Sequence, residues 1–397
     1  MLVATARLND RQGRVIKLKI DGVLREAPEL WDLLSSGTET LVARFPDGRE
    51  QSVEAVDPNG SRFLRTPPDG DDSNNLEALP VASFNVLVLG DSISWGQGLR
   101  KEQKISSLMT EEIRRVNGDA VATIVNYARS GSVLTSGLTP PPIRLDFNLE
   151  NERGEVPNTN VSVNKQIDDF LAQGHDPLKV DFLQLCAGIN DVGLSNILTY
   201  LDNRSAIIPQ VASHIASPMT SLLNRCLQLF ANARIFVLGY YTIISEKSFP
   251  RTPDEVDAAV GILTETRPSP HSVFTDTARR NVIANCRAFT VSSRDTIQGV
   301  VDGVNAGQRI RVFFVDPDFA PRHCLFTPLR TSLLFGLTIG MTTTDPMRSA
   351  RTELCGVVHA ANDADTLFRR KNCNLAAVGH PKPEGAKRYF NAMKPFL

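Results

Sequence analysis

The pattern of apolar and polar positions divides the chain into two differently organised parts. Up to about residue 65, short alternating runs are separated by turn-forming residues. The runs are 15–20, 40–45, 51–56 and 62–64, and the turns are Asp21-Gly22, Pro46-Asp47-Gly48 and Pro58-Asn59-Gly60. Alternation with a period of two is typical of half-buried strands, and these turn residues adopt the conformations that reverse a strand. Residues 1–65 are therefore predicted to form a small antiparallel β module, with one helical turn around 30–34.

From about residue 84 the pattern changes to strands that alternate with helices. Residues 84–89 form a run that is apolar except for Asn85, which is typical of a strand covered on both faces. Further strands are predicted at 120–127, 180–186, 233–241 and 310–315, and helices at 106–116, 163–172, 209–230 (interrupted by Pro218), 277–304 and 384–393. This alternation predicts a parallel sheet wrapped by helices through right-handed crossovers. We expect this α/β domain to span 84–397 and a polar linker to span 66–83.

Length and charge exclude several classes of partner. The chain has 397 residues, and its 43 basic and 44 acidic side chains give a formal net charge of −1. Such a balance produces no field that would attract nucleic acid. No apolar stretch reaches the roughly 20 residues of a membrane-spanning helix, and the first residues lack the pattern of a signal peptide. We therefore expect a soluble, cytoplasmic protein without stable membrane insertion and without a nucleic-acid partner.

The six cysteines are widely scattered in a chain that is long enough to bury a large core. They are Cys186, Cys226, Cys286, Cys324, Cys355 and Cys373. This spacing differs from that of a small disulfide-stapled protein, so free and mostly buried thiols are expected. No Cys-x-x-Cys unit is present, and no metal site is predicted.

Two connections are longer than ordinary loops. One spans 138–160 and contains Pro140-Pro141-Pro142, and the other spans 245–271. Long insertions near the carboxyl end of a strand often shape a pocket or a lid, although a solvated excursion without such a role is an alternative interpretation.

The first predicted strand of the α/β domain ends in Gly90-Asp91-Ser92. A glycine permits a tight exit from the strand, and the serine then lies where a helix would begin, with its hydroxyl exposed. Hydrolases with a G-x-S-x-G motif present their nucleophile in a similar place, but this chain lacks that motif. The alternative interpretation is that Ser92 only caps the helix.

Three other polar blocks lie at corresponding places along the chain. Residues 126–132 (Asn-Tyr-Ala-Arg-Ser-Gly-Ser) follow the second predicted strand, and residues 188–191 (Gly-Ile-Asn-Asp) follow the third. Residues 380–385 (His-Pro-Lys-Pro-Glu-Gly) lead into the last helix. Because the carboxyl ends of parallel strands share one edge of the sheet, all four blocks are expected to converge there.

These four blocks, in this order and context, resemble those of the SGNH (GDSL-like) hydrolase superfamily. The run Trp95-Gly96-Gln97-Gly98-Leu99 strengthens the resemblance, which covers residues 84–397 and leaves the β module outside. The resemblance implies a flavodoxin-like three-layer α/β sandwich with a central parallel sheet, here preceded by a small all-β domain. It also implies a serine hydrolase that cleaves carboxylic esters, namely lipid, acyl-sugar or aryl esters.

The resemblance assigns roles that match what ester hydrolysis requires. Ser92 is implied as the nucleophile, and His380 as the general base that takes its proton. The N–H groups of Ser92 and Gly131 and the side-chain amide of Asn190 are implied as the oxyanion hole. Such a reaction proceeds through an acyl-enzyme and uses neither a metal nor an organic cofactor.

One position departs from the family pattern, because Ala377 stands where an aspartate usually precedes the histidine by three residues. That acid orients the imidazole and stabilises its charged form. A backbone carbonyl that holds the ring in a Ser–His dyad is the interpretation we favour, and Asp363 or Asp365 as a substitute acid is a second. A catalytically impaired domain that serves as a binding or scaffold protein is the third. An acyltransferase that uses the same serine is a further alternative.

The remaining candidates have structural interpretations. Asp91 and Asp191 follow strand ends and are expected to support the loops through hydrogen bonds to the backbone. His323 and Trp95 are interpreted either as pocket walls or as packed side chains.

Overall fold

The computed structural model describes residues 1–9, 15–20, 23–57, 62–67, 76, 79–117, 120–134, 161–249, 253–264, 275–307, 309–328, 330–338, 342–358 and 364–397. The strands are β1 (Leu2–Asn9), β2 (Val15–Ile20), β3 (Val23–Glu26), β4 (Leu41–Arg44), β5 (Glu50–Val56), β6 (Phe63–Arg65), β7 (Ser83–Gly90), β8 (Val121–Asn126), β9 (Phe182–Cys186), β10 (Arg234–Leu238) and β11 (Val312–Val315). The helices are α1 (Ala27–Ser35), α2 (Ser92–Trp95), α3 (Ile105–Val116), α4 (Val163–Ala172), α5 (Ile189–Val192), α6 (Leu194–Ile197), α7 (Arg204–Val211), α8 (Ser217–Leu229), α9 (Pro253–Thr264), α10 (Asp276–Asn305), α11 (Arg348–Val358), α12 (Ala364–Asn374) and α13 (Pro383–Met393).

The larger part of the molecule is built on a five-stranded sheet with the order β11-β10-β9-β7-β8. All of its pairs are parallel, which confirms the predicted α/β fold. Numbered along the domain, the order is 2-1-3-4-5, the flavodoxin-like arrangement. The strand order reverses between β7 and β9, and a crevice opens beyond the carboxyl ends of strands at such a point.

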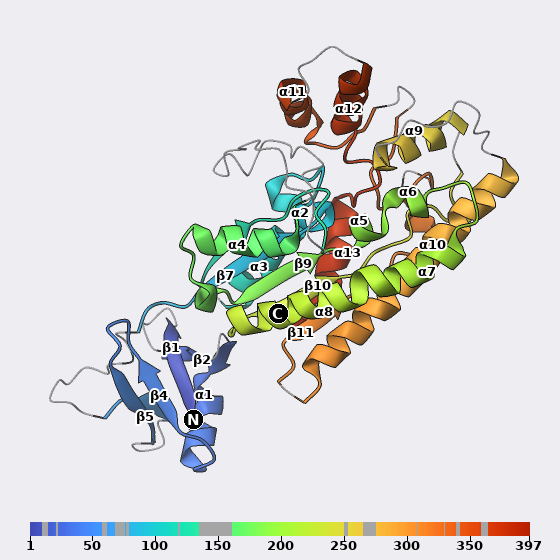
Figure 1. The fold of residues 1–397 in the computed structure, drawn as a ribbon. Coiled ribbons are helices and arrows are strands. Elements are labelled where there is room, and N and C mark those ends of the chain that lie inside the picture. Colours follow the sequence, from blue (N-terminus) through green and yellow to red (C-terminus); the bar gives the residue numbers. More distant parts are fainter. Residues whose placement is uncertain are drawn as a thin grey trace.

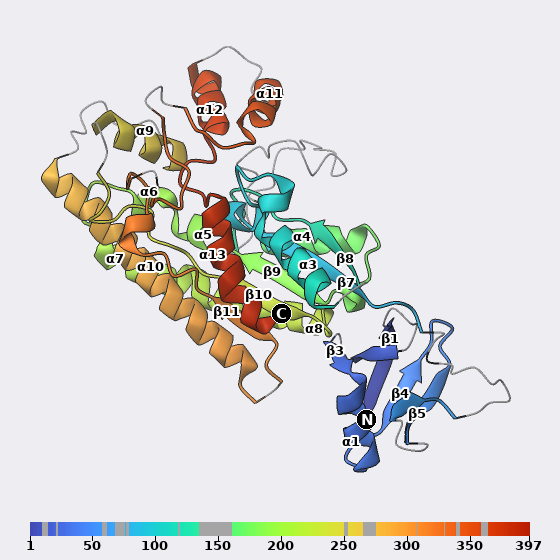
Figure 2. The ribbon, with the colours of Figure 1, turned by 180° about the vertical axis from the view of Figure 1, so that it is seen from behind.

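Helices cover both faces of this sheet, as its buried strands require. In Figure 1, α4 and α8 lie over one face, and Figure 2 shows α3 and α13 over the other. All residues of β9 are buried, which explains why four of its five residues are apolar, with Gln184 as the exception. The helices α9, α11 and α12 gather beyond the carboxyl ends of the strands, at the top of both views.

The predicted helix over 209–230 begins earlier and continues through Pro218. A π-helical segment, Ala212–Ala216, joins α7 to α8, and Pro218 lies in the first turn of α8. Proline has no N–H to donate to the carbonyl one turn before it, and a wider turn at that place accommodates the missing bond.

The N-terminal part forms a six-stranded sheet with the order β3-β2-β1-β4-β5-β6. Its pairs are antiparallel except for β1 and β4, which run parallel, so the sheet is mixed. The alternating runs did not predict β1, because its inward-facing residues Ala4 and Ala6 are small and carry little apolar signal. The helical turn expected around 30–34 is a 9-residue helix, α1, which packs on β5 and β6.

Part of the segment predicted as a linker belongs to the core of this module. Leu76 and Leu79 are buried together with Leu30 and Leu41. The backbone of Arg7 then pairs with Pro80 and Ala82, which extends the module to the first residues before β7. The described part of 66–83 is therefore packed against the module.

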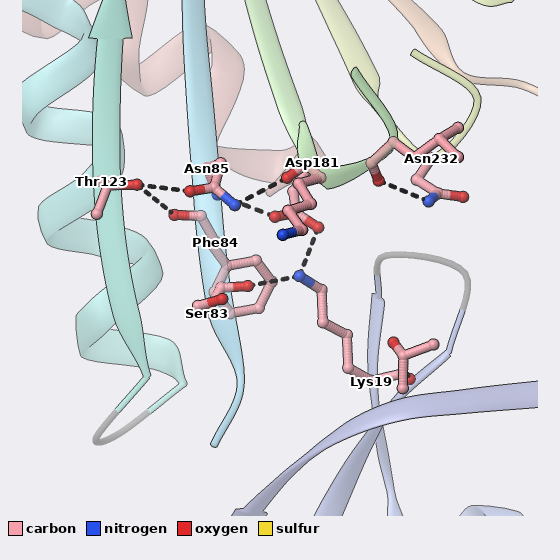
Figure 3. A network of polar contacts seen from close by, with 10 residues as sticks. Lys19, Ser83, Phe84, Asn85, Thr123, Asp181 and Asn232 are labelled. Carbon is pink, nitrogen blue, oxygen red and sulfur yellow. Dashed lines mark hydrogen bonds and ion pairs between the residues drawn. The ribbon is translucent and has the colours of Figure 1, made fainter. Parts of the chain in front are cut away.

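A buried ion pair joins the two parts of the molecule (Figure 3). The Nζ atom of Lys19 in β2 lies 2.5 Å from Oδ1 of Asp181, and it also donates to the carbonyl of Ser83 at 2.5 Å. The other carboxylate oxygen of Asp181 accepts from the N–H of Asn85. Because Ser83 begins β7 and Asp181 directly precedes β9, the module is attached at the amino ends of the central strands.

The expectation that all cysteines are free is wrong for two of them. Cys355 of α11 and Cys373 of α12 form a disulfide, while Cys186, Cys226, Cys286 and Cys324 are free and buried. The pair is separated by 18 residues along a helical hairpin, and no motif in the sequence marks that pairing. Disulfides are uncommon in a reducing cytoplasm, so this bond is an argument against the predicted location.

Among the described helices, none combines the length and the apolar character that crossing a bilayer would require.

Candidate active site

Ser92 is positioned by an unusually tight exit from β7. Gly90 has a φ of 112°, and a Cβ atom there would lie 2.0 Å from the carbonyl oxygen of Cys186, so only glycine fits. The next N–H, that of Asp91, donates to this same carbonyl at 2.8 Å. Ser92 then begins α2 at the carboxyl edge of the sheet.

Asp91 fixes this turn from inside the protein. Its carboxylate is fully buried and accepts from the N–H of Ile93 at 3.0 Å and from the hydroxyl of Tyr240 at 2.8 Å. Burial raises the pKa of Asp91 to about 6, against the opposing effect of these hydrogen bonds. Asp91 thus lies behind the nucleophile as a support. Tyr240, which follows the end of β10 on the far side of β9, was not anticipated.

His380 approaches Ser92 from the far end of the chain. Its Nε2 atom lies 2.7 Å from the Oγ atom of Ser92, across 288 residues of sequence. Two hydrogen bonds hold the segment that carries the imidazole. The N–H of Phe335 donates to the carbonyl of His380, and the hydroxyl of Tyr241 donates to the carbonyl of Gly379, both at 2.8 Å.

The other ring nitrogen of His380 has no hydrogen-bond partner among the described residues, although it is buried. The carbonyls of Val378, Ala377 and Ala376 oppose the effect of burial on the ring, but burial prevails and lowers the pKa of His380 to about 4. Within the described part of the chain, none of these carbonyls makes a hydrogen bond of ordinary geometry with this nitrogen, although all three lie close enough to the ring to raise its pKa. Asp363 lies outside the described residues, and for Asp365 only the backbone, in α12, is described.

Gly131 and Asn190 line the same cavity as Ser92 and His380. The side-chain amide of Asn190 donates to the carbonyl of Ser132 at 2.8 Å, which ties the loop after β9 to the loop after β8. The carboxylate of Asp191 accepts from the N–H of Leu134 and so also holds the loop after β8. Asp191 thus supports this loop through the backbone.

A buried glutamine braces both loops, and it was not predicted as a site residue. Gln166 of α4 exchanges two hydrogen bonds with the backbone of Gly90, at 2.7 and 2.9 Å, and donates to the hydroxyl of Ser132 at 2.8 Å. A signal for this residue exists in the sequence. Gln166 is the polar member of the helix face that also carries Val163, Ile167 and Phe170.

A cavity of about 340 Å³ opens above Ser92. Its described lining consists of residues from six segments: Ser92, Ile93, Ser130, Gly131, Ile189, Asn190, Gly193, Leu194, Ser195, Tyr241, Ile243, Ile262, Leu263, Asn372, Ala376, Gly379 and His380. Trp95 and His323 are outside this lining. The Nζ atom of Lys104 lies 4.0 Å from the centre of the Trp95 ring, and Nδ1 of His323 accepts from the N–H of Ala320.

The outer wall of the cavity comes from segments in which no motif had been recognised. Ile262 and Leu263 belong to α9, within the long connection 245–271, and Asn372 of α12 donates to the carbonyl of Gly261 at 3.3 Å. The connection 138–160 lies outside the described residues.

A fully buried ion pair lies behind the turn that leads to His380. The guanidinium of Arg351 makes two hydrogen bonds with the carboxylate of Asp345, at 3.0 and 2.6 Å, and also donates to the carbonyl of Asn374. Neither charged side chain is exposed. The positive charge of Arg351 contributes to the lowered pKa of His380.

Within the described ranges, no group of three or more His, Cys, Asp or Glu side chains is arranged to hold a metal ion.

Comparisons with known proteins leave the function to be argued from these residues. Residues 3–80 match a family described as a protein of unknown function (DUF3892), and a comparison with the curated proteins finds no match. Similar solved structures include an extracellular lipase from Streptomyces rimosus, with 13% identity, a TM-score of 0.41, and coverage of 80% of this chain and 100% of that chain. A phospholipase A1 from Streptomyces albidoflavus NA297 has 13% identity and a TM-score of 0.41, and the match covers 80% of this chain and 99% of that chain. A putative GDSL-like lipase from Parabacteroides merdae has 11% identity, a TM-score of 0.32, and coverage of 79% and 95%.

Proposed function

We propose that this protein is a serine hydrolase of the SGNH type that cleaves carboxylic esters. The main support is the 2.7 Å contact between Oγ of Ser92 and Nε2 of His380. The contact lies at the carboxyl edge of a flavodoxin-like sheet, where the strand order reverses and ligands bind in this class of fold. Gly131 and Asn190 line the same cavity and supply donors of the kind that stabilise an oxyanion.

In the proposed reaction, Nε2 of His380 takes the hydroxyl proton while Oγ of Ser92 bonds to the ester carbonyl carbon. The carbonyl oxygen becomes an oxyanion, which accepts from the N–H groups of Ser92 and Gly131 and from the amide of Asn190. The bond from carbon to the alcohol oxygen then breaks, and His380 returns its proton to that oxygen. A water molecule, deprotonated by the same imidazole, releases the acyl group from Ser92.

The environment of His380 determines how this base works. Because burial lowers its pKa to about 4, the imidazole is neutral at pH 7 and ready to accept the proton. The same environment disfavours the imidazolium that forms during the reaction, because the nearby carbonyls of residues 376–378 make no hydrogen bond of ordinary geometry with the other ring nitrogen and offset the burial only in part. The proposed enzyme is therefore a Ser–His dyad with a weakly supported base.

The nucleophile is tested with Ser92→Ala. This variant is expected to lose hydrolysis of p-nitrophenyl esters and covalent labelling by a fluorophosphonate, with the adduct located by intact mass and peptide mapping. Ser94→Ala is the matched control, because Ser94 is a buried serine two residues further on with no hydrogen-bond partner on its hydroxyl. Full turnover in Ser92→Ala would contradict the proposal.

The unpartnered ring nitrogen also favours a second candidate, a catalytically impaired domain that binds esters without cleaving them. The two functions differ in one measurement. A hydrolase forms an acyl adduct on Ser92 of about the mass of the acyl group, detectable within milliseconds to seconds of mixing, whereas a binding protein retains the intact ester and forms no adduct.

A further inference from the structure

The lining of the cavity indicates a substrate class, provided that the proposed hydrolase function holds. We infer that the cavity takes neutral aliphatic esters of medium chain length and that Leu263 of α9 limits the chain that fits.

The described cavity wall combines aliphatic and neutral polar side chains and is almost free of charge. Ile189, Leu194, Ile243, Ile262 and Leu263 supply its apolar surface. Within the described part of the lining, His380 is the one side chain with an ionisable acidic or basic group near neutrality. A charged group on the substrate would therefore lose its hydration without meeting an opposite charge, which is costly.

The polar groups of the wall already serve the protein. The Ser130 hydroxyl donates to Gln97, the Asn372 amide donates to the carbonyl of Gly261, and the Tyr241 hydroxyl donates to that of Gly379. Sugar recognition depends on polar groups that are aimed at the ligand. The hydroxyls of Ser130 and Tyr241 and the amide of Asn372 are instead aimed at the protein, and the aliphatic side chains of the wall suit an alkyl chain.

Leu263 lies directly against the segment that carries the base. A Cβ atom on Gly379 would be 3.1 Å from Cδ2 of Leu263, so the two residues are in close contact beside His380. The preceding turn of α9 is fixed by the hydrogen bond from Asn372 to the carbonyl of Gly261. A held leucine next to the reacting atoms is placed to set the depth of the cavity.

The volume gives the length of chain. A cavity of about 340 Å³ has the volume of roughly eleven water molecules, at about 30 Å³ each in the liquid. An octanoyl group with its ester oxygen has ten non-hydrogen atoms and fits this volume, whereas a palmitoyl ester does not. Up to this limit, each added methylene that becomes buried should raise kcat/KM about fourfold.

The inference is tested with p-nitrophenyl esters from acetate to palmitate. The wild type is expected to show a kcat/KM maximum between butyrate and decanoate, and to cleave the octanoate at least tenfold faster than p-nitrophenyl hydrogen suberate, which has the same length and a terminal carboxylate. Leu263→Ala should move the maximum to chains about two carbons longer. Leu229→Ala, a leucine-to-alanine change in α8 outside the cavity, should leave the profile unchanged.

Binding separates this inference from the proposed function. Titration calorimetry of Ser92→Ala with methyl octanoate and with monomethyl suberate measures selectivity without hydrolysis. Preference for the neutral ester, weakened in the Ser92→Ala/Leu263→Ala protein, supports the inference even if the wild type cleaves nothing. Equal affinity for the two esters, or equal chain-length profiles of kcat/KM for the Leu263 and Leu229 variants, would overturn the inferred substrate class. Neither result would contradict the proposed ester cleavage.

Discussion

Replacing Ala377 by aspartate tests how the imidazole of His380 is held. Ala377 is fully buried, and its carbonyl accepts from the N–H of His380 at 3.0 Å, so the two residues are joined by one tight turn. A carboxylate at position 377 would start within reach of the Nδ1 atom, which has no partner among the described residues. The Cβ atom of Ala377 faces Gly98, where an added Cβ would lie only 2.7 Å away, so the longer aspartate side chain has to turn away from Gly98 to fit.

The size of the effect follows from the value of one charge-assisted hydrogen bond. Such a bond contributes about 1.5–3 kcal/mol. At about 1.36 kcal/mol for each pKa unit, the pKa of His380 should rise from about 4 to about 5–6. Stabilising the imidazolium by the same amount in the transition state should raise kcat/KM about ten- to a hundredfold at pH 8. The nearby positive charge of Arg351 reduces the cost of burying the new carboxylate.

The assay is the pH dependence of kcat/KM for one neutral ester. In the wild type, activity should rise with pH through an inflection near 4, because the base acts when it is unprotonated, and in Ala377→Asp the inflection should move upward. Ala377→Asn is the control, since an amide of the same shape accepts a hydrogen bond but carries no charge. Thermal unfolding establishes that both variants are folded. A folded Ala377→Asp with the wild-type rate and inflection would refute the reasoning.

Two further predictions concern parts of the molecule away from the reacting atoms. Lys19→Met should lower the free energy of unfolding by about 3–5 kcal/mol, because it leaves the buried carboxylate of Asp181 without its partner, while kcat/KM at 25 °C stays within twofold. Denaturant unfolding and a double-mutant cycle with Asp181→Asn measure this, and an additive cycle would contradict it. Alkylation of the unfolded protein should modify four cysteines without reductant and six with it, as counted by intact mass. Six modifications in both samples would show that Cys355 and Cys373 are not joined.

Much of the sheet could be predicted because its strands are buried on both faces. The run at 182–186 is apolar except for the buried Gln184, and no competing helical pattern exists there. The strand at 2–9 was missed for the opposite reason, because its buried positions are alanines. The helices α9, α11 and α12 lie in the excursions beyond the sheet, where local sequence indicates little about packing.

Prediction of the site from the sequence has the same limit, because local motifs can be recognised and contacts between distant residues cannot. The blocks at Ser92, Gly131, Asn190 and His380 are local motifs, and in the structure they line one cavity. Tyr240, by contrast, meets Asp91 across 149 residues, and this contact depends on the strand order. The Arg351–Asp345 pair and the cysteine pairing likewise depend on contacts within an excursion whose fold the sequence pattern did not indicate.

The attachment of the β module at the amino ends of the strands has a practical consequence. β7 alone is 8 residues long, about 26 Å at 3.3 Å per residue, and it separates Ser83 beside the module from the turn before Ser92. Met1 lies in the module, at the end of the molecule away from α9, α11 and α12 (Figures 1 and 2). If the protein is attached to a support through its N-terminus, the cavity above Ser92 therefore faces away from the support. A partner bound on the outer side of the module would likewise leave access of substrate to Ser92 free.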